Sequence, residues 1–451
     1  MSDSDSDEPT PIPPITNDNA STPLWRAIWN PRMLICVFIG FSSGLPLWYL
    51  WQLIPYWLRT NDLSLTSIGM FSLLMLPYNW KFVVAPLLDR YVVPGFGRRR
   101  GWMFVSQVAL MVMIAAMGYF NPEQSIWGIA YLSFAVACAG AIQDIAIDAY
   151  RRELLPDNEL GMGNAIHVNA YRVAGLVSFS LAVYLSKFAD WRMVHLFVAL
   201  WMIPGAVVSL LVTEPKIYGE PPKTLRKAVI EPFKEFFQRS GGTRTALLVL
   251  LFMLLYKFGD NLALALITPF YHDMGFSEEQ IAFVTKTIAL IAMIVGGFAG
   301  GFIMFRIGIN RSLWLFGAVQ LASILGLAYL ATQGNNVWVL AGVVAFEYLG
   351  VGLGGAALVA FQAKQSDLRF TATQLSLFTS LMAIPRAFTG PIAGFLIEGN
   401  ESAGFGGLGY ASFFLLCAVT AIPGMLLLFK VAPWTERMDA DAATTSVIRS
   451  S

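Results

Sequence analysis

Acidic residues stand inside long apolar stretches of the sequence, where an ionised group is costly. Asp144 and Asp148 are four positions apart, a spacing that places both carboxyl groups on one face of a helix. Two carboxylates this close favour protonation of one member near neutral pH. We therefore predict a proton-binding pair, with Asp144 as the first candidate and Asp148 as the second. The structural alternative is that Asp148 pairs with Arg151 or Arg152.

A second charged pair lies further along the chain. Lys257 and Asp260 are three positions apart on one helical face, and this spacing favours an ion pair as much as a functional site. Glu347 is another acid within an apolar stretch. Asp260 and Glu347 are therefore further candidates for proton coupling, and Lys257 is a candidate ligand for an acidic substrate.

Basic residues within the apolar stretches outnumber the acids that remain free. Arg172, Arg386, Lys286 and Lys81 have no carboxylate at helix-neighbour spacing, and a surplus of cations suits an anionic ligand. The arginine side chain forms a fork that matches a carboxylate or a phosphate, so Arg172 and Arg386 are the first candidates for substrate binding. Cross-helix partners such as Glu347 are the structural alternative. Candidate hydrogen-bonding neighbours of the substrate are Gln52, Tyr78, Asn79, Gln143 and Tyr171.

Signatures of metal and nucleotide enzymes are missing from the sequence. There is no HExxH motif, and the Gly-rich run 350–355 lies inside an apolar stretch, where it favours close helix packing over phosphate binding. The three cysteines also stand in apolar stretches, without the spacing of metal ligands. We predict no enzymatic activity, no cofactor and no metal site. A net charge of +1, with basic residues in short clusters, argues against nucleic-acid binding.

The charged residues must be positioned by helices that cross a lipid bilayer. Hydrophobic residues make up 56% of the 451 residues and charged residues only 13%, and apolar stretches of bilayer length recur along the chain. A charge at the centre of such a helix costs about 3 kcal/mol in contact with lipid, so the charges must face an enclosed, wet interior. Twelve spans are predicted, near residues 33–58, 66–88, 101–120, 126–150, 160–185, 191–212, 245–271, 278–304, 312–332, 336–363, 372–397 and 408–430.

The predicted spans form two repeated halves of six helices. Arg172 in the fifth span corresponds to Arg386 in the eleventh, and a basic loop follows both the second and the eighth span. Lysine and arginine clusters in the loops place both termini in the cytoplasm. Separately, we expect the protein to be a monomer. The predicted parts are a disordered tail at 1–30, an N-terminal half at 31–213, a linker with an amphipathic surface helix at 214–243, a C-terminal half at 244–430 and a tail at 431–451.

Several motifs together resemble a known family. The segment from Asp89-Arg90 to Arg98-Arg99-Arg100 is similar to the signature loop between helices two and three of major facilitator transporters, although Ala85 stands where a glycine is usual. More narrowly, the chain from about Pro31 to Phe429 resembles the AmpG muropeptide permeases. The motifs that carry this resemblance are Gly40–Pro46, Phe96–Trp102, Gln143-Asp144 with Asp148-Ala149, Tyr256–Asp260 and Ala372-Thr373-Gln374.

The resemblance implies an all-α membrane protein with the major facilitator fold, in the bacterial inner membrane. It implies proton-coupled import of anhydro-muropeptides, GlcNAc-anhydroMurNAc with or without peptide, from periplasm to cytoplasm for peptidoglycan recycling, linked to β-lactamase induction. It also implies that the family's important carboxylate pair falls on Asp144 and Asp148, and that the loop with Asp89, Arg90, Arg98, Arg99 and Arg100 gates transport. The alternatives are a transporter of another anionic solute, such as a siderophore or acetyl-CoA, and a membrane-embedded enzyme or sensor without transport.

Overall fold

The computed structural model describes residues 30–61, 63, 71–215, 224–399 and 406–434. Within these ranges, eleven helices are long and apolar enough to cross a membrane. The predicted span 66–88 begins outside the described residues and continues as three short helical pieces, η3 (Ser72–Met75), α5 (Leu76–Asn79) and α6 (Lys81–Arg90). The predicted tails lie almost wholly outside these ranges. The chain is therefore a multi-pass, all-helical membrane protein.

The N-terminal half contains the first six predicted spans. Its remaining elements are α2 (Pro31–Trp48), η2 (Tyr49–Leu53), α3 (Ile54–Thr60), α7 (Arg99–Met117), α8 (Ile126–Leu154), α9 (Leu160–Gly175), η4 (Leu176–Leu181), α10 (Ala182–Leu185), α11 (Trp191–Leu200) and α12 (Ile203–Leu211). Apart from span 66–88, its spans begin and end within a few residues of the predicted limits, because long apolar stretches end where the sequence turns polar or reaches Gly and Pro.

The C-terminal half repeats this arrangement. Its elements are α14 (Thr243–Leu255), α15 (Phe258–Leu264), α16 (Ile267–Asp273), α17 (Glu278–Phe283), η5 (Val284–Ile288), α18 (Ala289–Ile307), α19 (Ile309–Gln333), α20 (Val337–Gln365), α21 (Thr371–Glu398) and α22 (Gly409–Val431). The first span is broken twice, before α15 and before α16. In a membrane, such interruptions are tolerated where the backbone is buried in protein or lines a cavity.

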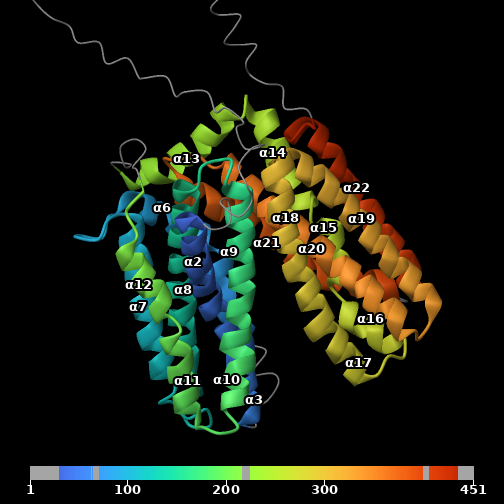
Figure 1. The fold of residues 1–451 in the computed structure, drawn as a ribbon, viewed down its shortest axis with the longest axis horizontal. Helices are drawn as coiled ribbons and strands as arrows, with labels where there is room; N and C mark the ends of the chain where they lie inside the picture. The colour runs from blue at the N-terminus through green and yellow to red at the C-terminus, as the bar shows by residue number, and fades with distance from the viewer. Residues whose placement is uncertain (1–29, 62, 64–70, 216–223, 400–405, 435–451) are drawn as a thin grey trace, which may run out of the picture.

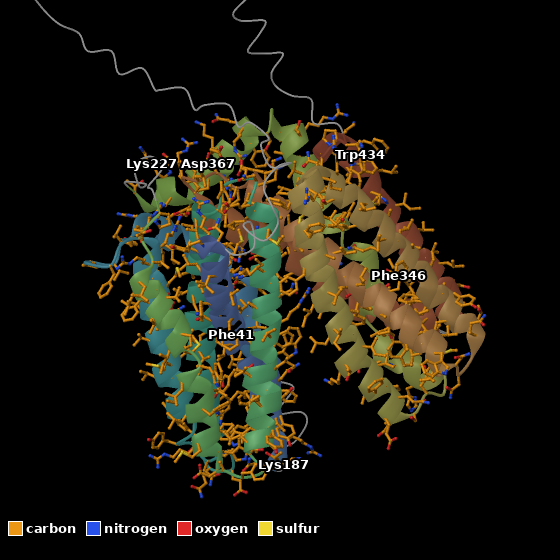
Figure 2. The ribbon with its side chains drawn as sticks, viewed as in Figure 1. Phe41, Lys187, Lys227, Phe346, Asp367 and Trp434 are labelled. Atoms are coloured by element: carbon orange, nitrogen blue, oxygen red, sulfur yellow. The ribbon has the colours of Figure 1, made fainter. Side chains whose placement is uncertain are left out.

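The two halves form separate bundles that meet at one end of the molecule (Figure 1). Helix α13 (Leu225–Arg239), whose N-cap is Thr224, lies across this end, which we call the linker end. There α21 packs against α6 and α8, and α9 packs against α18 and α20. At the opposite end, which we call the far end, the bundles stand apart; the exposed Lys187 marks the tip of the N-terminal half (Figure 2). The structure is thus closed at the linker end and open at the far end.

Glycines allow the helices inside each half to approach closely. A Cβ atom on Gly40 or Gly44 of α2 would lie 2.4 Å from a backbone oxygen of α9, which belongs to His167 or Tyr171 respectively. In the C-terminal half, a Cβ on Gly352 of α20 would lie 2.3 Å from the Met293 carbonyl oxygen of α18. Small residues of this kind let membrane helices pack backbone to backbone.

Candidate functional site

A cavity of about 260 Å³ lies between the two halves. The N-terminal half contributes the ends of α2 and α9 with η2 and η4, and the C-terminal half contributes η5, α18 and Tyr348 of α20. The three π-helical segments among the described residues, η2, η4 and η5, all supply lining residues. Single π-helical turns inside α-helices occur frequently at functional sites, and here they mark the region where the bundles face each other.

Three predicted substrate-binding residues line this cavity together. They are Gln52 of η2, Arg172 of α9 and Lys286 of η5. Arg172 donates from Nη1 to the Asn169 side chain, 3.2 Å away, and to the carbonyl oxygen of Met293 in the other half, 3.0 Å away. Neither Arg172 nor Lys286 has a carboxylate partner in an ion pair among the described residues, so the cavity contains two cations suited to an anionic ligand.

Aromatic rings stand beside these cations. Trp48 lines the cavity, and its ring stacks with that of Trp51 at a centroid distance of 6.1 Å and an interplanar angle of 21°. Trp48 also donates from Nε1 to the Tyr171 carbonyl oxygen, 3.1 Å away, and the two rings are 6.3 Å apart. Tyr171 therefore holds the Trp48 ring in place. A flat, partly apolar surface next to cations is suited to a sugar that bears acidic groups.

The predicted acid pair lies in the N-terminal half and is neutralised across helices. Lys81 of α6 contacts Asp144 at 2.5 Å and Asp148 at 3.4 Å, and Arg151 contacts Asp148 at 2.8 Å. Asp144 also accepts a hydrogen bond of 2.7 Å from Ser43. The predicted structural alternative, pairing of Asp148 with Arg151, is thus confirmed. Two carboxylates face two cations, so this cluster is neutral with both acids ionised.

Three other predicted ligands lie outside the cavity lining. Gln143 is fully buried and donates to Ser42, so it ties α8 to α2. Asn79 is exposed. Tyr78 lies under Gly140 of α8, its hydroxyl group buried and without a hydrogen-bond partner among the described residues. The geometry therefore supports Gln52, Arg172 and Lys286 as ligands. Gln143, Asn79 and Tyr78 have no direct access to a ligand in the cavity.

A second charged cluster is buried in the C-terminal half. Lys257, the N-cap residue of α15, forms an ion pair of 2.5 Å with Asp260 in the first turn of the same helix, which confirms the contact predicted from their spacing. Lys257 therefore lies away from the cavity lining. Glu347 of α20 is fully buried near this pair. Arg386 lies in α21, but its side chain is outside the described part of the chain.

The predicted gating loop forms a buried network at the linker end. Asp89 accepts hydrogen bonds from Arg99 at 2.7 Å and, across the two halves, from the Thr373 backbone N–H at 2.9 Å and hydroxyl at 2.6 Å. Thr373 lies in the first turn of α21, so Asp89 caps this helix from the opposite half, where a carboxylate is favourable. Arg99 also pairs with Glu153 at 2.7 Å. These bonds hold the linker end closed.

The other loop arginines support this network to different degrees. Arg98 pairs with Glu153 at 3.2 Å. The backbone N–H groups of Arg99 and Arg100 donate to the Glu214 carboxylate at 2.7 and 3.1 Å, so Glu214 caps the start of α7. Arg90 lies over the ring of the adjacent Tyr91. Arg98, Arg99 and Arg100 thus anchor the loop.

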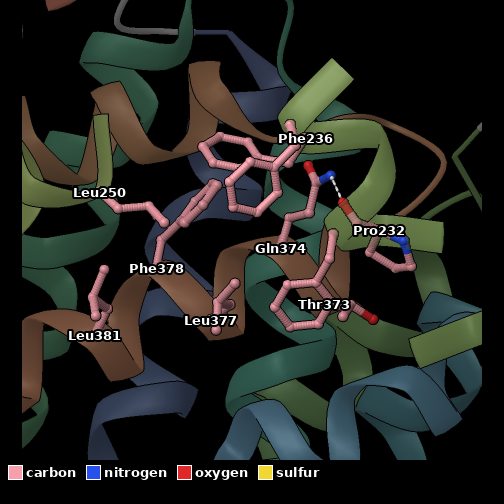
Figure 3. Close-up of a pocket in the computed structure, with 10 residues that line it drawn as sticks. Pro232, Phe236, Leu250, Thr373, Gln374, Leu377, Phe378 and Leu381 are labelled. Atoms are coloured by element: carbon pink, nitrogen blue, oxygen red, sulfur yellow. Dashed lines mark hydrogen bonds between the residues drawn. The ribbon is translucent and has the colours of Figure 1, made fainter. Parts of the chain in front are cut away.

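Helix α13 is fastened to the C-terminal half by Gln374. This residue donates to the Pro232 carbonyl oxygen at 2.9 Å (Figure 3). It also donates to the Glu235 carboxylate at 2.7 Å and accepts from the Asp367 backbone N–H at 2.6 Å. Burial raises the pKa of Asp367, but hydrogen bonds and the charge of Arg369 outweigh burial and lower it. The pocket beside Gln374 is lined by apolar side chains of α13, α14 and α21, which does not suit a charged sugar.

Several of these residues were not singled out as site residues by their sequence. Trp48, Phe179, Ser180, Thr285 and Tyr348 line the cavity, but their types are common in membrane helices and π-helical turns have no sequence signature. Thr373 and Gln374 belong to the motif Ala372-Thr373-Gln374, which is one of the motifs that carry the family resemblance. That motif indicated from the sequence that this segment is important, but not which contacts it makes.

One motif match requires a structural explanation. Gly40–Gly44 fits the Gly-x-Ser-x-Gly pattern of hydrolases. In those enzymes the serine stands at a sharp strand-to-helix turn, whereas Ser42 is fully buried within α2. Its hydroxyl oxygen accepts hydrogen bonds from Gln107 and Gln143, at 3.0 and 2.8 Å. Ser42 is therefore a packing residue and not an exposed nucleophile.

Comparisons with known proteins place the chain in a family. The family model described as Major Facilitator Superfamily matches residues 36–365. An uncharacterised protein of Haemophilus influenzae is 47% identical over 422 residues, which cover 92% of this chain and 97% of that protein. The anhydromuropeptide permease of Escherichia coli K12 is 38% identical over 405 residues, which cover 89% of this chain and 80% of the permease.

Solved structures show the same fold. The human organic anion transporter TETRAN superposes with a TM-score of 0.66 at 15% identity, over 90% of this chain and all of that one. The transporter FucP in its outward conformation gives a TM-score of 0.67 at 12% identity, over 90% of this chain and 99% of that one. From the family model, the curated relatives and the shared fold, this chain belongs to the Major Facilitator Superfamily and, within it, to the family of the anhydromuropeptide permeases.

Proposed function

We propose that the protein imports anhydro-muropeptides, GlcNAc-anhydroMurNAc with or without peptide, across the bacterial inner membrane. The observation that supports this most is the cavity between the halves, where Arg172 and Lys286 stand next to Trp48. The cations match the acidic groups of the lactyl and peptide parts, and the indole ring matches the apolar face of a sugar. The name of the Escherichia coli relative agrees with this chemistry.

Direction and energy source are part of the same proposal. With the basic linker end in the cytoplasm, the far end opens to the periplasm, and the substrate enters from there. A membrane potential supplies about 2.3 kcal/mol per proton per 100 mV, so proton symport is sufficient for accumulation. Because one chain provides both walls of the cavity, the protein acts as a monomer. Import would serve peptidoglycan recycling and influence β-lactamase induction.

Binding to the purified protein tests the substrate class. GlcNAc-anhydroMurNAc-tripeptide, titrated by calorimetry into protein in detergent, is expected to bind, and Arg172→Gln is expected to weaken the affinity by roughly tenfold or more through loss of a charge-assisted contact. Ser180→Ala, a small change in the same cavity wall, is the matched control. No binding to the wild-type protein would contradict the proposal.

Another anionic solute is the second candidate, because the same two cations would accept it. A ferric catecholate siderophore and acetyl-CoA, used as competitors in the same titration, separate the possibilities. Binding of either compound with a higher affinity than the muropeptide, and loss of the muropeptide signal in its presence, would favour that alternative.

A further inference from the structure

The buried cluster Lys257, Asp260 and Glu347 has one more acid than it has bases. The exposed fractions of these residues are only 9%, 3% and 0%. Lys257 and Asp260 form an ion pair of 2.5 Å and so neutralise each other. Glu347 is left as an additional carboxyl group in the interior of the C-terminal half, whereas the adjacent Phe346 is exposed on the outer face of this half (Figure 2).

Few donors among the described residues lie beside Glu347 to stabilise a carboxylate. Neither of its oxygens has a hydrogen-bond partner among the described residues. Its polar neighbours are the hydroxyl of Ser323 and the carboxyl of Asp260, but Ser323 donates its hydrogen to the Gln320 carbonyl oxygen at 2.9 Å. Asp260 Oδ1 likewise has no hydrogen-bond partner in the described part of the chain. Two carboxyl groups therefore lie side by side, with acceptor oxygens that make no hydrogen bond to another described residue.

The other titratable groups around Glu347 do not balance its charge. Tyr271 of α16, Tyr348 of α20 and Cys417 of α22 lie within electrostatic reach, and all three side-chain types are uncharged or mostly so at neutral pH. Arg172 of α9 and Lys286 of η5 line the cavity, which Glu347 does not. Lys257 is the cation that acts most on Glu347 among the described side chains, and it is already paired with Asp260.

The N-terminal half provides the comparison. There Asp144 and Asp148 face Lys81 and Arg151, so two negative charges meet two positive charges. In the C-terminal cluster, ionisation of both acids would leave one uncompensated buried charge, and its desolvation costs more than protonation of a carboxylate. A proton added there removes the excess charge and supplies the missing hydrogen bond between the two acids.

We infer that Asp260 and Glu347 share one bound proton in this far-end-open conformation, and that Glu347 is the residue whose protonation changes during transport. The first part stands without any substrate, whereas the second rests on the proposed import function. Tyr348, next to Glu347 in sequence, lines the cavity, so the acid pair is one residue away along α20 from the wall of the proposed substrate site. Asp144, which its sequence favours as the proton carrier, becomes a salt-bridged residue in this account.

Infrared spectroscopy detects the bound proton directly. Purified wild-type protein at pH 7 should show the carbonyl stretching band of a buried protonated carboxylic acid. Glu347→Gln should lose this band, and so should Asp260→Asn, because the remaining acid then pairs with Lys257 and ionises. Lys257→Met should instead gain a second protonated acid. The matched control is Asp144→Asn in the other half, which should retain the wild-type band.

Defined outcomes would overturn the inference. They are a wild-type spectrum without the band, a band that survives in both Glu347→Gln and Asp260→Asn, and a band that Asp144→Asn removes. Absence of the band in sodium buffer and its appearance in sodium-free buffer would show that a sodium ion occupies the site. If Arg386 balanced Glu347, the band would be absent from the wild type and appear only in Arg386→Gln.

Transport assays test the second part of the inference. In proteoliposomes, Glu347→Gln should reduce pH-gradient-driven muropeptide accumulation far more than it reduces exchange of muropeptide between the two sides, since exchange needs no proton release. Equal losses in both assays would contradict the role of Glu347 as carrier. If wild-type protein transports no muropeptide in either assay, the import function fails while the infrared result for the bound proton still stands.

Discussion

The replacement of Asp89 by asparagine should shift the protein away from the far-end-open conformation. Of the three hydrogen bonds to Asp89, the one from Arg99 stays within the N-terminal half, and the two from Thr373 cross between the halves. Charge-assisted bonds contribute about 1.5–3 kcal/mol each. Water replaces part of these bonds when the linker end opens. The substitution should therefore reduce the stability of the far-end-open conformation, relative to the alternative one, by roughly 2–4 kcal/mol. This corresponds to a shift of about 30- to 1,000-fold in the conformational equilibrium.

Spin-label distances across the far end measure this shift. Labels at Lys187→Cys and Glu279→Cys stand on exposed residues of the two halves, in a background in which Cys36, Cys138 and Cys417 are replaced. Wild-type protein should give mainly long distances, and Asp89→Asn should move most of the population to shorter ones. Thr373→Val, which removes the hydroxyl bond and keeps the backbone bond, should give a smaller shift. An unchanged distribution in a folded Asp89→Asn protein would refute the reasoning.

The structure also predicts three effects on stability and binding. Lys81→Met should lower the melting temperature, because it leaves the Asp144 carboxylate, whose side chain is only 18% exposed, without its cation at a cost of up to about 3–5 kcal/mol; addition of Asp144→Asn should restore part of the loss, and failure of this rescue would contradict the charge count. Gly44→Ala should destabilise the protein, since the new Cβ would lie 2.4 Å from a backbone oxygen, whereas Gly342→Ala, with no atom within 4 Å, should not; equal melting temperatures would contradict the packing argument. Arg172→Lys should retain weak muropeptide binding in calorimetry where Arg172→Gln loses most of it, because lysine keeps the charge without the fork.

The helix limits could be predicted from the sequence because the bilayer imposes a length and an apolar composition on each span. The predicted span 126–150 corresponds to α8, and the predicted linker helix to α13. Two spans are less regular than predicted: the described part of span 66–88 is broken around Pro77 and Trp80, and span 245–271 is broken before α15 and before α16. Pro77 marks one of these breaks in the sequence, whereas the others depend on neighbouring helices and have no such local signal.

The pairing of charges could be predicted within a helix but not between helices. The Lys257–Asp260 and Asp148–Arg151 contacts follow from spacings of three residues. Lys81 has no acid at such a spacing and therefore adds to the predicted surplus of cations, yet α6 brings it against two aspartates of α8. Lys81 is therefore not part of the surplus of cations without an acidic partner. Among the described side chains, that surplus consists of Arg172 and Lys286. Contacts between residues on different helices cannot be predicted from helical periodicity, because the residues are far apart in the sequence.

Uptake of radiolabelled GlcNAc-anhydroMurNAc-tripeptide into proteoliposomes tests the account most directly. With an inwardly directed proton gradient, wild-type protein should accumulate the muropeptide above its external concentration, and an uncoupler should release it. Arg172→Gln should transport little, since the cavity then lacks one of its cations. Accumulation that is unaffected by the gradient would contradict proton coupling, and absence of uptake in vesicles that contain folded protein would contradict the proposed function itself.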